Sequence, residues 1–370
     1  MRPSSSIFSF DTLVGLPRPS RALVLTLAIC GLCRLGITVA SDWLDGIPAS
    51  VTNKWYADVE HVLVQQSKTP PKILLMGNSL TRYGLCSDQM ADAFGLERNE
   101  IANLAIPSGN VWQALVLLRR NPDRLADVEM IFFGVDPGQI HAGARARHID
   151  HYYQFSTLRE KCTVDRYGDR CRLVVDWVWP YRSQRRDVVT WLRGLHGEFP
   201  EGLVEPFDVA WLPENMAKMK ARRQEFMSPP SKVAGVAGPL SGQYQKHFHE
   251  FVSICRDRGI RLVFVGSALR DSYLAAVAAD PELRAGFDRF ERFFDGLGAE
   301  FLDYHRISSH ERLGLNSPED FLDLCHMTPS GARKLTAAVV NDCLRQGLLP
   351  PSIAKRVPAS FSPQLASGRR

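Results

Sequence analysis

Short apolar runs recur along the chain and are separated by longer segments of mixed apolar and polar residues. Four runs have the length and composition of buried strands, at residues 73–76, 101–105, 128–134 and 260–266, and a weaker one lies at 300–304. Helical patterns lie between them, at residues 85–94, 111–120, 243–258 and 280–297. Strands that alternate with helices in this way predict an α/β fold, in which a parallel sheet carries helices on both faces.

The alternation lapses between residues 138 and 240. This stretch contains Trp177, Trp179 and Trp191 and many arginines, but no clear strand run. We therefore predict a largely helical insertion at 138–240, between the third and fourth strands. The whole chain then divides into an N-terminal segment at 1–40, a stalk at 41–70, an α/β domain at 71–347 that contains the insertion, and a tail at 348–370 with the composition of a disordered end.

A long apolar segment near the N-terminus predicts export of the main domain. Residues 22–33 are apolar or small, and the pattern resumes after Arg34 up to residue 40, close to the length of about 20 residues that crosses a bilayer. Basic residues precede the segment at positions 2, 18 and 21, and acidic residues follow it at 42 and 45. A membrane anchor would leave everything after residue 40 outside the cytoplasm. The alternative is a cleaved signal peptide that ends near residues 38–40, which exports the same domain.

The composition fits a globular domain and argues against nucleic-acid binding. Of the 370 residues, 45% are hydrophobic, which is enough for a sizeable core. The net charge is +5, but the basic residues are scattered and do not form a stripe interleaved with aromatic residues. We therefore expect no nucleic-acid partner.

The chain has eight cysteines, which an exported domain would keep in an oxidising environment. Cys162 and Cys171 flank a polar stretch with a turn signal, and we predict that a disulfide closes this loop. The remaining cysteines have no evident partner by spacing and are typical of small buried hydrophobic residues.

Metal-binding patterns are weak. His148 and His151 form a His-x-x-His pair near His141 and Asp150, but no fourth ligand is obvious, and the chain has no two CxxC motifs. We expect neither a metal ion nor a cofactor.

Polar residues suited to catalysis or ligand binding lie where the predicted strands end. In open α/β sheets, ligands bind at the carboxyl ends of the strands. The first strand ends in Gly77-Asn78-Ser79, the second is followed by Ser108 and Gly109, and the third ends at Gly134 and Asp136. Near the C-terminus, Asp323 and His326 precede a helix that we expect to begin at Thr328-Pro329 and to run to about residue 347.

These residues fit nucleophilic catalysis by serine. A serine hydroxyl needs an imidazole to take its proton, and the imidazole needs a carboxylate on its other nitrogen. Ser79 is therefore the candidate nucleophile, His326 the candidate base and Asp323 its partner. Cys325 lies beside the base, and we expect it to face the core. The alternative for Ser79 is a simple turn residue, because Asn and Ser both favour turns.

The order of these motifs resembles that of the SGNH (GDSL-type) hydrolase superfamily. Gly77-Asn78-Ser79 matches its first block, Gly109 or, by one step, Ser108 matches the glycine of its second block, and Asp323 and His326 match its last block. The resemblance covers residues 71 to about 345 without the insertion. It is closest to the membrane-anchored branch that includes the alginate O-acetylation proteins and the D-alanine transfer protein of teichoic acid synthesis.

The resemblance implies a three-layer, flavodoxin-like sheet and a Ser-His-Asp triad, with Asn78, Ser108, Gly109 and Asp136 at the oxyanion or substrate. It also implies an extracytoplasmic esterase or O-acyltransferase that acts on acyl groups, acetyl above all, of a cell-envelope or exported polysaccharide. A membrane-bound acyltransferase would be a partner of such a protein. Hydrolysis and transfer remain alternatives, because they differ only in whether water or a sugar hydroxyl reaches the acyl-enzyme.

One position departs from the pattern of the superfamily. Its third block is Gly-x-Asn-Asp, in which the Asn donates to the oxyanion, but here Asp136 occupies that place. The loss of one such donor typically lowers the rate by about 10² to 10³. Asp136 is therefore turned away, protonated or used differently, or the activity is weak. A degenerate, membrane-tethered binding or scaffold subunit is the alternative to an enzyme.

Overall fold

The computed structural model describes residues 70–106, 109–141, 236–316 and 319–361, with short pieces at 25, 28–29, 31–32, 161–162, 164 and 167–178. Its centre is a five-stranded sheet in the order β2-β1-β3-β4-β5, in which all neighbours run parallel. The strands are β1 (Ile73–Met76), β2 (Ile101–Asn103), β3 (Met130–Val135), β4 (Arg261–Gly266) and β5 (Glu300–Asp303). This strand order is that of a flavodoxin-like doubly wound sheet, which confirms the predicted α/β fold with a parallel sheet.

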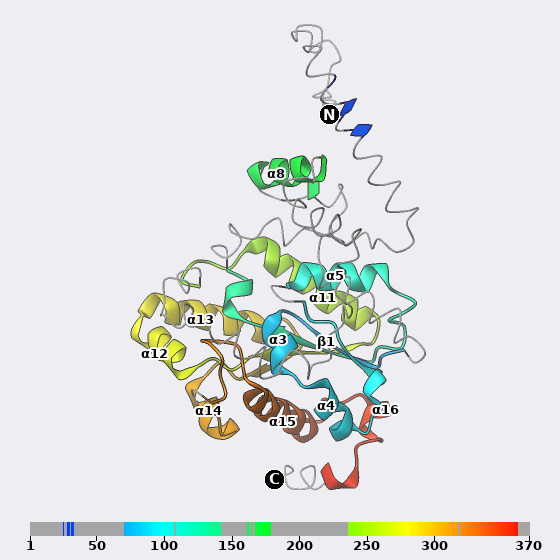
Figure 1. Cartoon of the computed structure of the whole chain (residues 1–370), viewed down its shortest axis with the longest axis vertical. Helices are drawn as coiled ribbons and strands as arrows, with labels where there is room; N and C mark the ends of the chain where they lie inside the picture. Colours follow the sequence, from blue (N-terminus) through cyan, green and yellow to red (C-terminus); the bar gives the residue numbers. More distant parts are fainter. Residues whose placement is uncertain are drawn as a thin grey trace, which may run out of the picture.

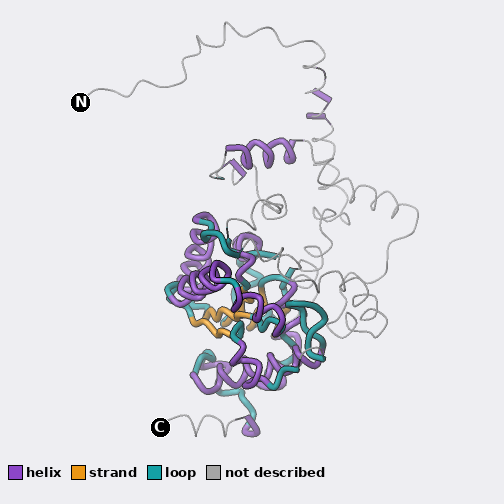
Figure 2. The backbone as a smooth tube through the Cα atoms, turned by 90° about the vertical axis from the view of Figure 1, so that its left-hand side faces the viewer, coloured by secondary structure: helices purple, strands orange, loops and turns teal. Residues whose placement is uncertain are grey.

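Helices cover both faces of the sheet (Figures 1 and 2). The helices of the domain are α3 (Ser79–Gly84), α4 (Ser87–Phe94), α5 (Val111–Arg120), α11 (Gly242–Asp257), α12 (Asp271–Ala279), α13 (Pro281–Asp295), α14 (Ile307–Leu313), α15 (Pro329–Gln346) and α16 (Pro351–Ala354), with 3-10 turns η2 (Arg98–Glu100), η3 (Pro137–Gln139) and η7 (Ala359–Phe361). Within the described residues of the predicted insertion, helix α8 spans Tyr167–Val178.

Alternate residues of each strand enter different cores, because side chains along a strand point to opposite faces. In β1, Leu74 and Met76 pack with α5, α11 and α13, whereas Ile73 and Leu75 pack with α4 and α15. Every residue of β1 and β3 is buried. Burial on both faces explains why these strands are continuous apolar runs in the sequence.

The two ends of the predicted insertion meet on the domain. His141, just after β3, forms an isolated antiparallel bridge with Leu240, just before α11. The backbone N–H of Ser241 also donates to the Ile140 carbonyl at 2.8 Å. The His141 ring is fully buried and its Nδ1 lies 2.8 Å from the Gly238 carbonyl oxygen, so this histidine closes the base of the insertion. The other members of the proposed histidine cluster, residues 148, 150 and 151, lie outside the described residues.

The predicted disulfide between Cys162 and Cys171 is wrong, because both thiols are free. The sequence predicts a loop between them that turns back on itself. Instead, α8 begins at Tyr167 and contains Cys171, so the second half of that stretch is helical. A polar composition with one turn signal is not enough to distinguish a closed loop from a helix.

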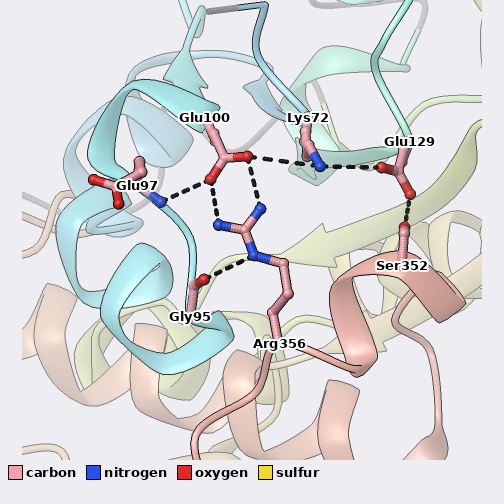
Figure 3. Close-up of polar contacts among 7 residues, drawn as sticks. All are labelled: Lys72, Gly95, Glu97, Glu100, Glu129, Ser352 and Arg356. Atoms are coloured by element: carbon pink, nitrogen blue, oxygen red, sulfur yellow. Dashed lines mark hydrogen bonds and ion pairs between the residues drawn. The ribbon is translucent and has the colours of Figure 1, made fainter.

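The prediction that residues 348–370 form a disordered tail is wrong for residues 348–361. Leu348, Leu349 and Ile353 are buried in the core on the α15 side of the sheet. Arg356 then donates to both carboxylate oxygens of Glu100 at 2.7 Å (Figure 3). The segment is ordered because three apolar side chains and one ion pair anchor it, although its proline-rich composition resembles that of a free end. Residues 362–370 lie outside the described residues.

The ion pair of Arg356 belongs to a network at the amino ends of the strands (Figure 3). Lys72, which precedes β1, lies 3.6 Å from Glu100 and 3.9 Å from Glu129. Glu129 in turn accepts from the hydroxyl of Ser352 in α16. The network ties the C-terminal segment to the starts of β1, β2 and β3.

The predicted membrane anchor and stalk lie almost wholly outside the described residues. Among the residues that are described, none of the helices combines the length and the apolar composition that crossing a bilayer requires.

Candidate active site

The turn after β1 presents Ser79 at the carboxyl end of the sheet. Gly77 has a φ of +128°, and a Cβ there would lie 2.5 Å from the Thr81 hydroxyl oxygen and 2.7 Å from the Gly134 carbonyl oxygen. Only glycine fits both the backbone conformation and the space. Asn78 then caps α3 by accepting the Leu80 N–H on Oδ1 at 2.8 Å, so Ser79 is the first residue of the helix.

Ser79, His326 and Asp323 form a continuous hydrogen-bonded chain. The Ser79 Oγ lies 2.8 Å from His326 Nε2. On the other side of the ring, Nδ1 lies 2.8 Å from Asp323 Oδ2 and 3.0 Å from Oδ1. A carboxylate can only accept at neutral pH, so Nδ1 carries the proton and Nε2 is left to accept from the serine. The geometry matches what nucleophilic catalysis by serine requires.

Asp323 is held in place by its own loop. Its Oδ1 accepts the backbone N–H groups of Cys325 at 2.9 Å and of His326 at 2.7 Å. Burial alone would raise the pKa of Asp323, but the bond and charge of His326 and the two backbone donors outweigh it and hold the pKa well below its usual range. The carboxylate therefore stays ionised beside the imidazole.

The loop that carries Asp323 and His326 is braced on both sides. The Leu322 N–H donates to the His326 carbonyl at 2.8 Å, and the Arg270 N–H donates to the Leu324 carbonyl at 3.0 Å. Thr328 caps α15 by accepting the Gly331 N–H at 3.3 Å, and Pro329 occupies the first turn, as the sequence predicts. His326 therefore lies at the entrance of a long helix whose position is set by the core.

Both carboxyl oxygens of Asp136 accept hydrogen bonds from neighbouring groups. Its Oδ2 accepts the side-chain Nδ2 of Asn78 at 2.5 Å, and its Oδ1 accepts the Gly138 N–H at 2.8 Å. Burial raises the pKa of Asp136, and this is opposed by the charges of His305 and His326 and by the two donors. Of the roles considered for this residue, the structure favours a different use, as an acceptor that holds Asn78.

Gly109 lies against the turn that carries Ser79. A Cβ at Gly109 would lie 2.5 Å from the carbonyl oxygens of both Gly77 and Ile106. Its N–H donates to Ile106 at 2.5 Å, and its carbonyl accepts from the Gln139 side chain at 3.2 Å. The second-block glycine is thus brought beside the first block. Ser108, the other candidate for this position, lies outside the described residues.

Three further side chains contact the site and have no role assigned from the sequence. Tyr83 in α3 lies edge-on to the His326 ring, with centroids 6.4 Å apart. Burial raises the pKa of the Tyr273 hydroxyl, and the nearby Asp136 carboxyl and Cys325 thiol raise it further. The Cys325 Sγ lies 3.5 Å from His326 Nδ1. The half-buried side chain also packs against a small apolar cluster that includes Leu269 and Leu274, so the expectation that it faces the core is confirmed in part. Apart from their proximity to motif residues, these three have no signal in the sequence.

A second His–Asp pair lies deeper in the fold. His305 is 1% exposed, and its Nδ1 lies 3.1 Å from Asp303 Oδ1 at the end of β5. A Cβ at Gly266 would lie 2.5 Å from this ring, so the imidazole packs directly on the β4 backbone. Within the described part of the chain, its Nε2 has no hydrogen-bond partner. The depth of this pair rules it out as the base for a substrate-facing serine.

Within the described ranges, a group of side chains suited to holding a metal ion is Asp323, Cys325 and His326, whose ligand atoms all lie within 4.8 Å of one another. This group includes two members of the hydrogen-bonded chain. No other described residues of the site suggest a cofactor.

Comparisons with known proteins identify no family. No family model matches the chain, and no curated protein matches it. One similar solved structure comes from a Bacteroides fragilis protein assigned as an acylhydrolase, with 11% identity, a TM-score of 0.33, and coverage of 77% of this chain and 95% of the other. A GDSL-like lipase from Bacteroides thetaiotaomicron has 10% identity, a TM-score of 0.36, and coverage of 81% and 98%. Similarities this low establish neither the family nor the activity of this chain.

Proposed function

We propose that this protein is a serine esterase or O-acyltransferase of the SGNH type. The observation that carries the proposal is the chain of contacts from the Ser79 hydroxyl to His326 Nε2, at 2.8 Å, and from His326 Nδ1 to Asp323, at 2.8 Å. These residues come from two segments of the chain far apart in sequence. They meet at the carboxyl end of a parallel sheet, which is where ligands bind in this fold class.

The mechanism follows from the position of each atom. The Ser79 oxygen attacks the carbonyl carbon of an acyl ester while His326 Nε2 takes the hydroxyl proton, and Asp323 stabilises the imidazolium that forms. His326 returns this proton to the leaving alcohol, and the acyl group stays on Ser79. In the second half, His326 takes a proton from water or from a sugar hydroxyl, which attacks the acyl-serine and frees the nucleophile.

We infer that Asn78 supplies a hydrogen bond to the oxyanion in place of the missing asparagine of the third block. Its Nδ2 carries two hydrogens, of which one is donated to Asp136. The second remains for a ligand, next to the nucleophile in the chain. The backbone N–H of Ser79 is the other candidate donor, and Gly109 shapes the adjoining loop. A role for Ser108 stays a prediction.

The substrate that we propose is an acyl ester, acetyl above all, on an exported or cell-envelope polysaccharide. The support comes from the N-terminal pattern, which predicts an extracytoplasmic domain tethered by residues 22–40, and from the motifs shared with the alginate O-acetylation and D-alanine transfer proteins. A membrane-bound acyltransferase would supply the acyl group in the transfer reaction.

A catalytically degenerate binding subunit is the second candidate, and Asp136 is the residue that favours it. An ionised carboxylate in the third block supplies no hydrogen bond to an oxyanion. The intact contacts among Ser79, His326 and Asp323 favour the enzyme, because a binding subunit has no need of them.

Labelling with a fluorophosphonate tests the proposal on the full chain in detergent. We expect the reagent to modify Ser79, and we expect Ser79→Ala and His326→Ala to remain unlabelled. Hydrolysis of an aryl acetate, measured with and without an acetylatable oligosaccharide, then separates an esterase from a transferase. Absence of labelling and of any Ser79-dependent acyl release or transfer would leave the binding subunit as the function.

A further inference from the structure

The thiol of Cys325 lies on the side of the His326 ring that faces Asp323, away from the side that faces Ser79. Its Sγ is 3.5 Å from Nδ1, the nitrogen that faces Asp323, whereas the nitrogen that faces Ser79 is Nε2. The thiol is therefore badly placed to replace Ser79 as nucleophile. It does, however, share Nδ1 with the carboxylate of Asp323, whose Oδ2 is 2.8 Å away.

These three groups have the chemistry of a zinc site. Thiolate, imidazole and carboxylate are the ligands of protein-bound zinc, and three protein ligands with an open fourth position are typical of sites that exchange water. The thiolate and the carboxylate together balance the charge of a divalent ion. The soft sulfur ligand favours Zn²⁺ over the hard ions Mg²⁺ and Ca²⁺.

The distances need little adjustment. Tetrahedral zinc, with bonds of about 2.0 to 2.3 Å, places its ligand atoms about 3.2 to 3.8 Å apart. The separation of 3.5 Å between Cys325 Sγ and His326 Nδ1 already falls in that range, and all three ligand atoms lie within 4.8 Å of one another. The pair of His326 and Asp323, at 2.8 Å, has to open slightly. Cys325 and His326 are partly exposed, so an ion can enter.

We propose that Asp323, Cys325 and His326 form an inhibitory site for zinc-class ions. The inhibition rests on the proposed function, but the binding does not. When a divalent ion binds Nδ1, the ring proton moves from Nδ1 to Nε2 and the Cys325 thiol releases its proton to solvent. With Nε2 protonated, the ring can no longer accept the proton of Ser79. Asp323, now a metal ligand, no longer orients the ring for catalysis.

Direct binding is tested with Co²⁺ as a spectroscopic substitute for Zn²⁺, on the chelator-treated full chain. We expect a thiolate-to-cobalt charge-transfer band in the wild type and equally in Ser79→Ala, which lacks the nucleophile. The band should be absent in Cys325→Ser and Cys325→Ala and retained in Cys171→Ser, the matched control at a cysteine of similar burial outside the site. A band that survives both Cys325 variants, or no band in a folded wild type, would overturn the site.

Inhibition is tested by the rate of ester hydrolysis against Zn²⁺ concentration, with each variant compared to its own metal-free rate. We expect reversible loss of wild-type activity that a chelator restores and that Mg²⁺ does not produce. Half-inhibition of Cys325→Ser should need at least about 10-fold more Zn²⁺, because even changes to groups around a metal's ligands lower affinity by about 10- to 100-fold. Equal sensitivity of the two proteins would refute the switch. An inactive wild type that still shows the cobalt band would refute the proposed function and leave the metal site standing.

Discussion

The side-chain amide of Asn78 donates to the carboxylate of Asp136 at 2.5 Å, across the carboxyl ends of the neighbouring strands β1 and β3. The direction of this bond is fixed, because Asn78 Oδ1 already accepts the Leu80 N–H and only Nδ2 is left for Asp136. In the SGNH pattern that these motifs resemble, the first block is usually Gly-Asp-Ser and the third is Gly-x-Asn-Asp. Relative to that pattern, the amide and the carboxylate are exchanged here, with the amide at position 78 and the carboxylate at position 136.

The exchange predicts that Asp136→Asn lowers activity. The carboxylate of Asp136 accepts from two donors, Asn78 Nδ2 and the Gly138 N–H. An amide at position 136 has one acceptor oxygen, so its NH₂ would face one of those donors and displace Asn78. We expect kcat/KM for ester hydrolysis to fall by up to about 10² to 10³, the contribution of one oxyanion donor. A rise in kcat/KM would show instead that Asp136 only occupies a spoiled donor position.

The double variant Asn78→Asp/Asp136→Asn supplies the matched control. The carboxylate introduced at position 78 can still cap α3, and it can accept from the NH₂ of the amide introduced at position 136. The oxygen of that amide then remains to accept the Gly138 N–H, and its second N–H can take over the oxyanion bond that we assign to Asn78. We expect this variant to recover most of the kcat/KM that Asp136→Asn loses. Losses that simply add in the double variant would show that the two side chains act independently.

Asp323→Asn is expected to damage catalysis through the tautomer of His326. Two backbone N–H groups hold the Oδ1 position, so an amide at position 323 keeps its oxygen there and turns its NH₂ toward His326 Nδ1. Nδ1 must then accept, and the ring proton moves to Nε2, where it blocks the transfer from Ser79. We expect kcat to fall by about 10³ to 10⁴ with the fold intact, measured by ester hydrolysis and circular dichroism. Combining it with Ser79→Ala should add little further loss, since the residues act as a unit.

The sequence predicts the parts of the site that lie at element ends, because periodicity locates those ends. Ser79 follows a buried run and His326 precedes a capped helix, so their convergence follows from a parallel sheet. The bond between Asn78 and Asp136 joins residues 58 positions apart, and no periodic pattern records such a contact. The direction of the Cys325 thiol depends on turn geometry within the loop, which hydrophobic alternation does not describe.

The wrong prediction for the C-terminal segment has a related cause. The anchor of this segment pairs Arg356 with Glu100, which are 256 positions apart, and composition near a chain end carries no information about a distant partner. The predicted disulfide between Cys162 and Cys171 rests on a polar stretch with one turn signal, and this local signal does not distinguish a closed loop from the start of a helix. Local patterns therefore predict the helices and strands, whereas contacts between residues distant in sequence decide whether a segment such as the C-terminal one is ordered.

Gly134→Ala is expected to destabilise the turn that carries Ser79. A Cβ at Gly134 would lie 1.8 Å from the Thr81 hydroxyl oxygen, inside a fully packed region. Overpacking of this kind costs about 1 to 3 kcal/mol. We expect a lower urea midpoint for unfolding of Gly134→Ala, and little change for Gly84→Ala, where the nearest atom, in Leu335, is 3.6 Å away.

We expect Thr81→Ala to restore part of the stability that Gly134→Ala loses. The Thr81 hydroxyl is buried and, among the described residues, has no hydrogen-bond partner, so its removal costs little in satisfied polar contacts. In the Gly134→Ala background it removes the atom that the new Cβ meets first, and part of the lost stability should return. Equal destabilisation with and without Thr81→Ala would place the strain elsewhere.

Arg356→Met is expected to destabilise the domain by about 1 to 3 kcal/mol, because it removes charged hydrogen bonds to the largely buried Glu100.

The bond from Arg356 holds the pKa of Glu100 below its usual value, against the opposing effect of burial. A carboxyl with a lowered pKa in the folded state stabilises the protein above its unfolded pKa, about 4.3 for Glu, and loses that contribution as the pH falls through the folded value. The difference in unfolding free energy between wild type and Arg356→Met should therefore be full at pH 7 and shrink below about pH 4. Urea unfolding across this range measures it, with the exposed Lys355→Met as the control that should differ little from wild type at any pH. A difference that stays constant down to acid pH would show that Arg356 stabilises the segment by packing of its side chain and not by its charge.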